Sequence, residues 1–176
     1  MPQHRVLVVG TGSIGERHLR CFAATGRAEM TLCETHDERR RAVAQKYSVA
    51  RSYADLDAAL ADRHDAAVIA TPAPLHVPMA TRLAQSGVHL LIEKPLSTSL
   101  DGISQFQCLV EEHKTVVAVA YVYRAHPALQ AMRPAISEGR FGRPVQIVAV
   151  CGQHFPTYRP AYREIYYTSR ATGGGA

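Results

Sequence analysis

The chain has 176 residues, 47% of them hydrophobic, which is enough apolar material for one packed core of ordinary domain size with some length left over. Its 20 Lys and Arg residues outnumber its 15 Asp and Glu residues and give a formal net charge of +5. The only tight basic cluster, residues 39–41, falls in an expected amphipathic helix and has no basic stripe or interleaved aromatic residues beside it, so we expect no nucleic-acid partner.

Short apolar runs alternate with helical patterns through the first 120 residues. The expected strands are residues 5–9, 28–33, 66–70, 89–92 and 115–120. Because these runs are apolar without alternation, both faces of each strand should be covered, which is typical of a parallel sheet. The pattern predicts an α/β domain, a doubly wound parallel Rossmann sheet over residues 1–122.

The segments between the expected strands carry helix signals. Thr35 and Thr98 each stand three residues before an acidic residue, as the first residue of a capping box does, and so predict helix starts. Apolar residues at helical spacing then predict the core-facing stripes, which are Val77, Ala80 and Ala84 in a helix from near His76, and Leu100, Ile103, Phe106 and Val110 in the next helix.

The composition changes after Tyr121. A helix with Leu129, Met132 and Ile136 on one face should precede a strand at residues 145–150 that begins a new sheet. We therefore predict that residues 123–176 are the truncated start of an α+β second domain. Glycines at 173–175 are a poor place for a domain to finish, because they bury no side chains, so we expect a fragment of a longer enzyme. A complete protein that binds a dinucleotide without catalysis is the alternative.

Cysteine spacing and hydropathy bear on location and on metals. Cys21, Cys33, Cys108 and Cys151 are widely scattered, which predicts small buried apolar residues and neither a zinc site nor a disulfide framework. The first apolar run is too short for a secretory signal, and no stretch approaches the length of a membrane span. We expect a soluble cytoplasmic protein with no membrane partner and no metal.

A glycine-rich turn follows the first expected strand and opens a helix, the context in which a GxGxxG pattern indicates dinucleotide binding. Gly10 permits the tight turn, Gly12 lets a pyrophosphate approach the backbone, and Gly15 allows the helix to pack closely. The free N–H groups at the helix start attract phosphate. The residues expected to bind the cofactor here are Gly10, Thr11, Gly12, Ser13, Ile14 and Gly15.

Glu34 stands just after the second expected strand. A carboxylate there accepts hydrogen bonds from the adenosine ribose hydroxyls and repels a 2′-phosphate, so Glu34 favours NAD over NADP. Arg39, Arg40 or Arg41 could reach a phosphate, which keeps NADP as the alternative.

Glu93, Lys94 and Pro95 follow the expected strand at residues 89–92. Ligands bind at the carboxyl ends of strands in such sheets, and Pro95 gives Lys94 a fixed direction, either in an extended conformation or through a cis peptide bond. Lys94 is therefore a candidate for removing a hydroxyl proton during hydride transfer. From the residues alone, a surface charge in a turn is an equal alternative.

Together these motifs resemble the Gfo/Idh/MocA family of oxidoreductases. The matching segments are residues 10–15, residues 70–72 with His76, residues 93–95, and residues 120–124 followed by residues 126–127. The resemblance implies an NAD(P)-dependent dehydrogenase that transfers a hydride between the nicotinamide and a secondary alcohol of a sugar or cyclitol, with Lys94 acting on the substrate. A non-catalytic dinucleotide-binding regulatory or sensor protein on the same fold is the alternative.

The resemblance also implies roles for further residues. Thr71 and Pro72 look like a cofactor-contacting turn. His76 looks like the histidine that opens the next helix and contributes to the cofactor site, although a capping or packing histidine is an equal alternative. Glu93 resembles the acidic residue that orients the corner beside the nicotinamide.

Tyr121 and Arg124 resemble residues of the domain junction that face cofactor and substrate, although a structural ion pair is an alternative for Arg124. In the family, the main acid-base histidine follows a glycine-rich stretch like residues 173–175, and this sequence ends before it. The full-length protein is expected to be a homo-oligomer that acts on a polyol or sugar.

Overall fold

The computed structural model describes residues 4–150, 152 and 157. The chain divides into two compact units, Met1–Ala120 and Tyr121–Ala176. No helix among the described residues combines the length and the apolar character needed to cross a membrane. The first unit holds the sheet and most of the residues that the sequence singled out.

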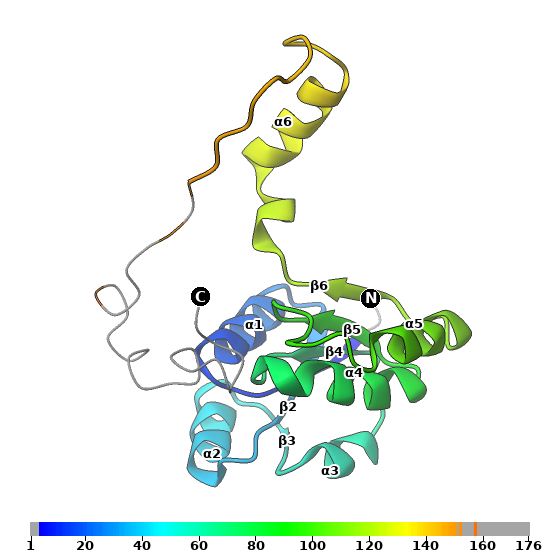
Figure 1. Ribbon diagram of the computed structural model, residues 1–176. Coiled ribbons are helices and arrows are strands. Elements are labelled where there is room, and N and C mark those ends of the chain that lie inside the picture. The colour runs from blue at the N-terminus through cyan, green and yellow to red at the C-terminus, as the bar shows by residue number, and fades with distance from the viewer. Residues whose placement is uncertain (1–3, 151, 153–156, 158–176) are drawn as a thin grey trace. The chain divides into compact units, whose positions relative to one another are not determined.

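The first unit is built on a parallel sheet of six strands in the order β3-β2-β1-β4-β5-β6 (Figure 1). Its strands are β1 (His4–Val9), β2 (Ala28–Cys33), β3 (Arg51–Tyr53), β4 (Ala66–Ile69), β5 (His89–Ile92) and β6 (Val117–Val119). The connecting elements are the helices α1 (Ser13–Ala24), α2 (Asp37–Lys46), α3 (Leu56–Leu60), α4 (His76–Gln85) and α5 (Ile103–Glu112), with the 3₁₀ turn η1 (Ala73–Leu75) before α4. The second unit contains the 3₁₀ turn η2 (Val122–Ala125) and the helix α6 (Pro127–Ser137).

Both faces of the sheet are covered, as the continuous apolar runs predict. In β1, Leu7 and Val9 belong to a core cluster shared with α3, α4 and α5. The intervening Val6 and Val8 belong to a second cluster on the opposite face, shared with α1 and α2. This alternation explains why β1 needs apolar residues at successive positions, and it confirms the doubly wound parallel sheet. The strand order reverses between β1 and β4, and in open parallel sheets ligands bind at the carboxyl edge of such a switch point.

Two strand predictions were wrong. β3, Arg51–Tyr53, has no apolar run, because an edge strand with exposed or half-buried residues needs none, and so it was missed. The expected strand at residues 145–150 does not form, and Val145 and Val150 are each 96% exposed. An extended apolar run becomes a strand only when a partner supplies hydrogen bonds, and none of the described residues pairs with this run.

The predicted helix caps were also wrong in detail. The N-cap of α2 is His36, whose ring accepts an amide hydrogen bond at 3.4 Å, and not Thr35. Gly102, in a left-handed conformation, precedes α5 in place of Thr98, so that Leu100 lies outside the helix and is 86% exposed. The stripe of α4 lies in the core as predicted.

Only one of the cysteines is known to be buried as predicted. Cys33 lies in the core, and this burial raises the pKa of its thiol to about 11, whereas Cys21 and Cys108 are exposed. Cys151 and the glycine run at residues 173–175 lie outside the described residues. Within the part of the chain that is described, no group of three or more His, Cys, Asp or Glu residues could hold a metal ion.

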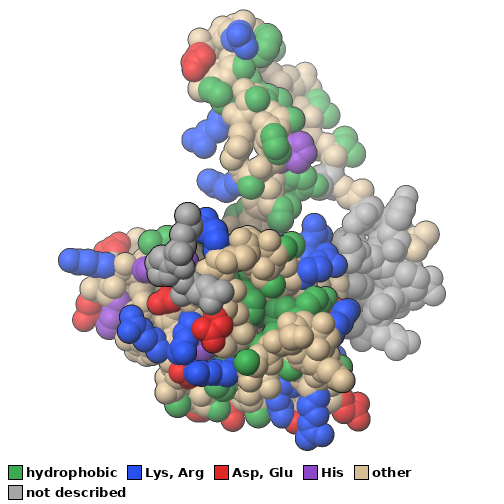
Figure 2. All heavy atoms as spheres, turned by 180° about the vertical axis from the view of Figure 1, so that it is seen from behind, with side chains coloured by type: hydrophobic (Ala, Val, Ile, Leu, Met, Phe, Trp, Pro, Cys, Tyr) green, Lys and Arg blue, Asp and Glu red, His purple; other side chains and the backbone are tan. Residues whose placement is uncertain are grey.

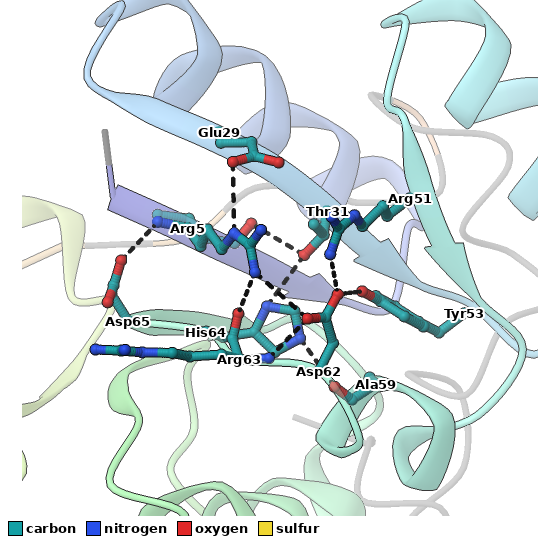
Figure 3. Close-up of polar contacts among 11 residues, drawn as sticks. Arg5, Glu29, Thr31, Arg51, Tyr53, Ala59, Asp62, Arg63, His64 and Asp65 are labelled. Carbon is teal, nitrogen blue, oxygen red and sulfur yellow. Dashed lines mark hydrogen bonds and ion pairs between the residues drawn. The ribbon is translucent and has the colours of Figure 1, made fainter. Parts of the chain in front are cut away.

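A group of polar side chains around Asp62, before β4, makes hydrogen bonds and ion pairs with residues of β1 and β3 (Figure 3). Asp62 accepts hydrogen bonds from Arg5 at 3.3 Å and from Tyr53 at 2.7 Å, and it forms an ion pair with Arg51. The Tyr53 hydroxyl and the Arg51 guanidinium hold the pKa of Asp62 well below its usual range. The buried His64 ring lies 2.9 Å from the Ala59 carbonyl oxygen.

On the face seen in Figure 2, basic and acidic side chains are interspersed.

Candidate functional site

The glycine loop between β1 and α1 is shaped by two close approaches. Gly10 has φ +82, and a Cβ added there would lie 3.0 Å from the Ala70 carbonyl oxygen. A Cβ on Gly15 would lie 1.9 Å from the Gly10 carbonyl oxygen, so that only glycine fits. By contrast, a Cβ on Gly12 would meet no atom within 4 Å. The loop therefore packs tightly against the protein at Gly10 and Gly15 and exposes its backbone at Gly12.

The start of α1 carries N–H groups that the helix itself leaves unpaired. Gly12 is the N-cap residue, and no side chain of the described residues caps this end of the helix. The first hydrogen bond of the helix runs from the Glu16 amide to the Gly12 carbonyl oxygen at 2.9 Å. The amides of residues 13–15 consequently have no acceptor within the helix and lie at the positive end of its dipole. Open backbone at Gly12 and these amides suit an anionic group such as a pyrophosphate.

The Glu34 carboxylate ties the end of β2 to the glycine loop. Glu34 is only 7% exposed. Its Oε2 accepts hydrogen bonds from the Thr11 amide at 3.0 Å and the Thr11 hydroxyl at 3.1 Å, and its Oε1 accepts one from the His36 amide at 2.9 Å. Burial opposes ionisation, but these hydrogen bonds outweigh it, so the pKa of Glu34 lies below its ordinary value. Because a carboxylate offers about four acceptor positions, these three hydrogen bonds leave about one position of Glu34 unused.

The three arginines of α2 differ in what they contact. Arg39 lies 3.6 Å from the Glu34 carboxylate and is half exposed. Arg40 donates to the Glu34 carbonyl oxygen at 3.1 Å and pairs with Asp37, and Arg41 also pairs with Asp37, at 2.6 Å. Of the three, only Arg39 approaches the acidic group at the end of β2.

The Glu93 carboxylate directly after β5 is buried and held from two sides. Its Oε1 lies 2.7 Å from Nε2 of His18 on α1, and its Oε2 accepts a hydrogen bond from the Lys94 amide at 3.3 Å. Burial opposes ionisation of Glu93, but the His18 hydrogen bond and charge together with the Lys94 amide hold its pKa below the ordinary value. Lys94 itself is exposed, and its ammonium makes no hydrogen bond or ion pair with any residue that the structure describes.

His18 was missed by sequence analysis, although a signal existed. It stands three residues after Gly15, one helical turn along α1, and so lies on nearly the same face of the helix. That face of α1 turns toward the strand ends, which is how a histidine of the glycine-loop helix comes to contact Glu93.

His76 is only 1% exposed, and both of its ring nitrogens face backbone carbonyls. Nδ1 lies 2.8 Å from the Pro95 carbonyl oxygen and Nε2 lies 2.8 Å from that of Thr71. The Lys94–Pro95 peptide bond is cis. His76 therefore connects the turn after β4 to the corner after β5, and its contacts are those of a packing histidine.

The remaining predicted residues fall into two groups. Thr71 and Pro72 follow β4 beside the glycine loop, because a Cβ on Gly10 would come within 3.1 Å of the Thr71 side chain. Tyr121 and Arg124 belong to the second unit and are exposed. The structure thus brings together the glycine loop, Glu34, the turn after β4 and the corner after β5, all within the first unit.

Comparison with known proteins agrees with this arrangement. A family model described as "Oxidoreductase family, NAD-binding Rossmann fold", with the short name GFO_IDH_MocA, matches residues 4–121. The UDP-N-acetylglucosamine 3-dehydrogenase of Acidithiobacillus ferrooxidans is 34% identical over 131 residues, which cover 74% of this chain and 41% of that protein. An inositol 2-dehydrogenase of Rubrobacter xylanophilus is 32% identical over 142 residues, which cover 78% of this chain and 41% of that protein.

Among solved structures, the chain is similar to the WlbA dehydrogenase from Bordetella pertussis in complex with NADH and UDP-GlcNAcA. The two share 34% sequence identity with a TM-score of 0.74, over 80% of this chain and 44% of WlbA. The chain thus spans less than half the length of each of these three relatives.

Proposed function

Because the chain belongs to the Gfo/Idh/MocA family of oxidoreductases, we propose that it is the dinucleotide-binding part of a dehydrogenase that acts on a secondary alcohol of a sugar or cyclitol. The observation that supports this proposal is that three features share one edge of one sheet: a helix start without a side-chain cap, the buried Glu34 carboxylate, and Lys94, whose ammonium has no hydrogen-bond partner among the described residues. The hydride would pass between the carbon of the alcohol and the nicotinamide.

The adenosine half of the cofactor would bind between the glycine loop and Glu34. The open backbone at Gly12 and the amides of residues 13–15 would receive the pyrophosphate. The remaining acceptor position on the Glu34 carboxylate would take a ribose hydroxyl, and the turn at Thr71 and Pro72 would contact the cofactor from the other side.

NAD is the proposed cofactor in preference to NADP. The lowered pKa of Glu34 keeps its carboxylate negatively charged at the place where the 2′-phosphate of NADP would have to lie. The two negative charges would repel each other. Arg39 is the residue through which the protein would accept NADP, because it already approaches this carboxylate and is half exposed.

Lys94 is the proposed residue for proton transfer at the substrate. Oxidation of a secondary alcohol removes a hydride from carbon and a proton from oxygen, and the bound cofactor takes the hydride. Lys94 would hydrogen-bond the reacting hydroxyl and help its proton to leave, since its ammonium forms no hydrogen bond or ion pair with any described carboxylate. A sugar or cyclitol substrate is supported by the relatives, one of which is named for UDP-N-acetylglucosamine and another for inositol.

The test of this function is NADH formation by the full-length protein in the presence of a panel of sugars, nucleotide sugars and cyclitols. We expect at least one of them to support turnover. Lys94→Ala should lower that turnover by about a hundredfold or more, the usual contribution of a general acid-base group, while the NAD affinity stays unchanged. Unchanged turnover in this variant would remove Lys94 from the mechanism, and no turnover with any compound would contradict the proposed activity.

A further inference from the structure

A hydrogen bond connects the glycine-loop helix to the lysine corner, which is residues 93–95. Nε2 of His18 lies 2.7 Å from Oε1 of Glu93, and the two side chains are 17% and 10% exposed. The lowered pKa of Glu93 means that the carboxylate is ionised and can only accept, so Nε2 of His18 carries the proton of this bond. A charge-assisted bond of this length, shielded from water, is among the stronger polar contacts in a protein.

The contact extends to the backbone of Lys94. The second oxygen of Glu93 accepts from the Lys94 amide at 3.3 Å, so the two oxygens of one carboxylate hold α1 and the corner together. On the other side of Lys94, the carbonyl of Pro95 lies 2.8 Å from the ring of His76 on α4. Lys94 therefore stands between two residues that histidines contact, one from each helical layer, while its own ammonium makes no hydrogen bond or ion pair with the described residues.

The position of His18 gives this contact a consequence for ligand binding. The same helix that carries His18 begins with the unpaired amides of residues 13–15, and without the His18 contact its connection to Lys94 would run through three neighbouring strands, β1, β4 and β5. The direct bond fixes the corner relative to the anion-binding amides. Fixing two parts of a ligand site relative to each other lowers the entropy lost when one molecule binds both.

We propose that His18 is a positioning residue for the nicotinamide end of the dinucleotide: it holds Glu93, and through Glu93 the backbone of Lys94, at a fixed place relative to the pyrophosphate site. This role rests on the proposed function, since it assumes that a dinucleotide spans the edge from the glycine loop to the corner. His18 touches neither cofactor nor substrate in this role.

The test compares two ligands that differ at the nicotinamide end only. ADP-ribose carries the adenosine, pyrophosphate and second ribose but lacks the nicotinamide ring, so it should not sense the corner. Calorimetric titrations with NADH and with ADP-ribose would be made on the 176-residue chain and on three variants, His18→Leu, His18→Gln and His113→Leu. His113 is the control because it is exposed at the end of α5 and its side chain makes no hydrogen bond or ion pair with a described residue.

We expect His18→Leu to weaken NADH binding about tenfold, the typical effect of leaving a buried charged acceptor without its donor, and to leave ADP-ribose binding unchanged. His18→Gln should recover most of the NADH affinity, because an amide N–H can still donate to Glu93. A general loss of stability would affect both ligands alike, and the control should affect neither.

A double-mutant cycle with Glu93→Ala makes the test independent of any one variant. If His18 acts only through Glu93, the double variant should bind NADH no more weakly than Glu93→Ala alone. Equal losses for NADH and ADP-ribose, or no loss for either, would overturn this role of His18 while leaving the proposed function intact. Failure of the unmodified folded chain to bind ADP-ribose and NADH would overturn the proposed function and this role with it.

Discussion

The two edges of the sheet both hold polar residues, but the contacts of these residues differ. At the amino edge, Asp62 is surrounded by Arg5, Arg51 and Tyr53, and each polar group has a side-chain partner (Figure 3). At the carboxyl edge, the Glu34 carboxylate is bound largely by backbone amides of the protein, and Lys94 has no partner among the described residues. The difference teaches that polar groups left with unused hydrogen-bonding capacity distinguish a ligand site from a structural network.

The strongest way to break this contrast is to disturb the close approach that forms the glycine loop. Gly15→Ala would place a Cβ 1.9 Å from the Gly10 carbonyl oxygen, and neither backbone segment can move away without distorting β1 or α1. We expect the free energy of unfolding to fall by about 3 kcal/mol or more, as in severe overpacking, measured by urea denaturation. A variant as stable as the parent chain would contradict the loop geometry.

The next effect in size is on binding alone. Gly12→Ala adds a methyl group where no atom lies within 4 Å, so stability should hardly change, but the methyl group would occupy the space proposed for the pyrophosphate. We expect about a tenfold or greater loss of NAD affinity by calorimetry. Gly152→Ala is the matched control, because a Cβ there also meets open space. If Gly12→Ala binds NAD like the parent, the pyrophosphate does not approach Gly12.

These glycine predictions also show what the sequence establishes by itself. Spacing after a strand was enough to locate Gly10, Gly12 and Gly15, because the tight turn from a strand into a closely packed helix needs glycine at fixed positions. The contact between His18 and Glu93 could not be predicted, since these residues are 75 positions apart and meet only after α1 and β5 have packed on the same sheet.

The fold was predictable to a similar extent. Runs such as β1 and β5 identify buried parallel strands because both faces must be apolar. The short edge strand β3 lacks that requirement, and residues 145–150 have the apolar pattern without a partner strand in the described chain. The hydrophobic pattern of a segment indicates whether it is buried. Whether the segment pairs as a strand depends on whether another strand lies beside it.

A smaller effect is expected on the pH dependence of stability, in which Glu34 at the carboxyl edge should differ from a carboxylate on the surface. The pKa of Glu34 is lowered in the folded chain, so its contribution to stability is fully present above its ordinary value of 4.5 and is lost as the pH falls through the folded value. Glu34→Gln should therefore show a shallower loss of stability than the parent as the pH falls below 4.5. Urea denaturation across this pH range measures it.

Glu38→Gln provides the comparison for that experiment, since Glu38 is exposed on α2 and its side chain makes no hydrogen bond or ion pair with a described residue. The free energy of unfolding of Glu38→Gln should fall with pH in the same way as that of the parent chain. If Glu34→Gln and Glu38→Gln gave the same profile, the hydrogen bonds from Thr11 and His36 would not stabilise the ionised form of Glu34.

The smallest effect is expected at the amino edge. Tyr53→Phe removes the hydroxyl that donates to Asp62 at 2.7 Å, but Arg5 and Arg51 remain as partners of that carboxylate. We expect a slight loss of stability, less than that of Gly15→Ala, and no change in NAD affinity. A fall in NAD affinity in this variant would show that the amino edge affects ligand binding, and would contradict a purely structural role for the contacts of Asp62.

The central claim is that the carboxyl edge of this sheet binds a nicotinamide dinucleotide with Glu34 selecting NAD. Its most direct test is calorimetric titration of the 176-residue chain with NAD and, separately, with NADP, after circular dichroism has confirmed that the chain is folded. The account predicts one NAD bound per chain, with weaker binding of NADP that improves in Glu34→Gln. Binding of neither dinucleotide by the folded chain, or a preference for NADP in the unmodified chain, would contradict it.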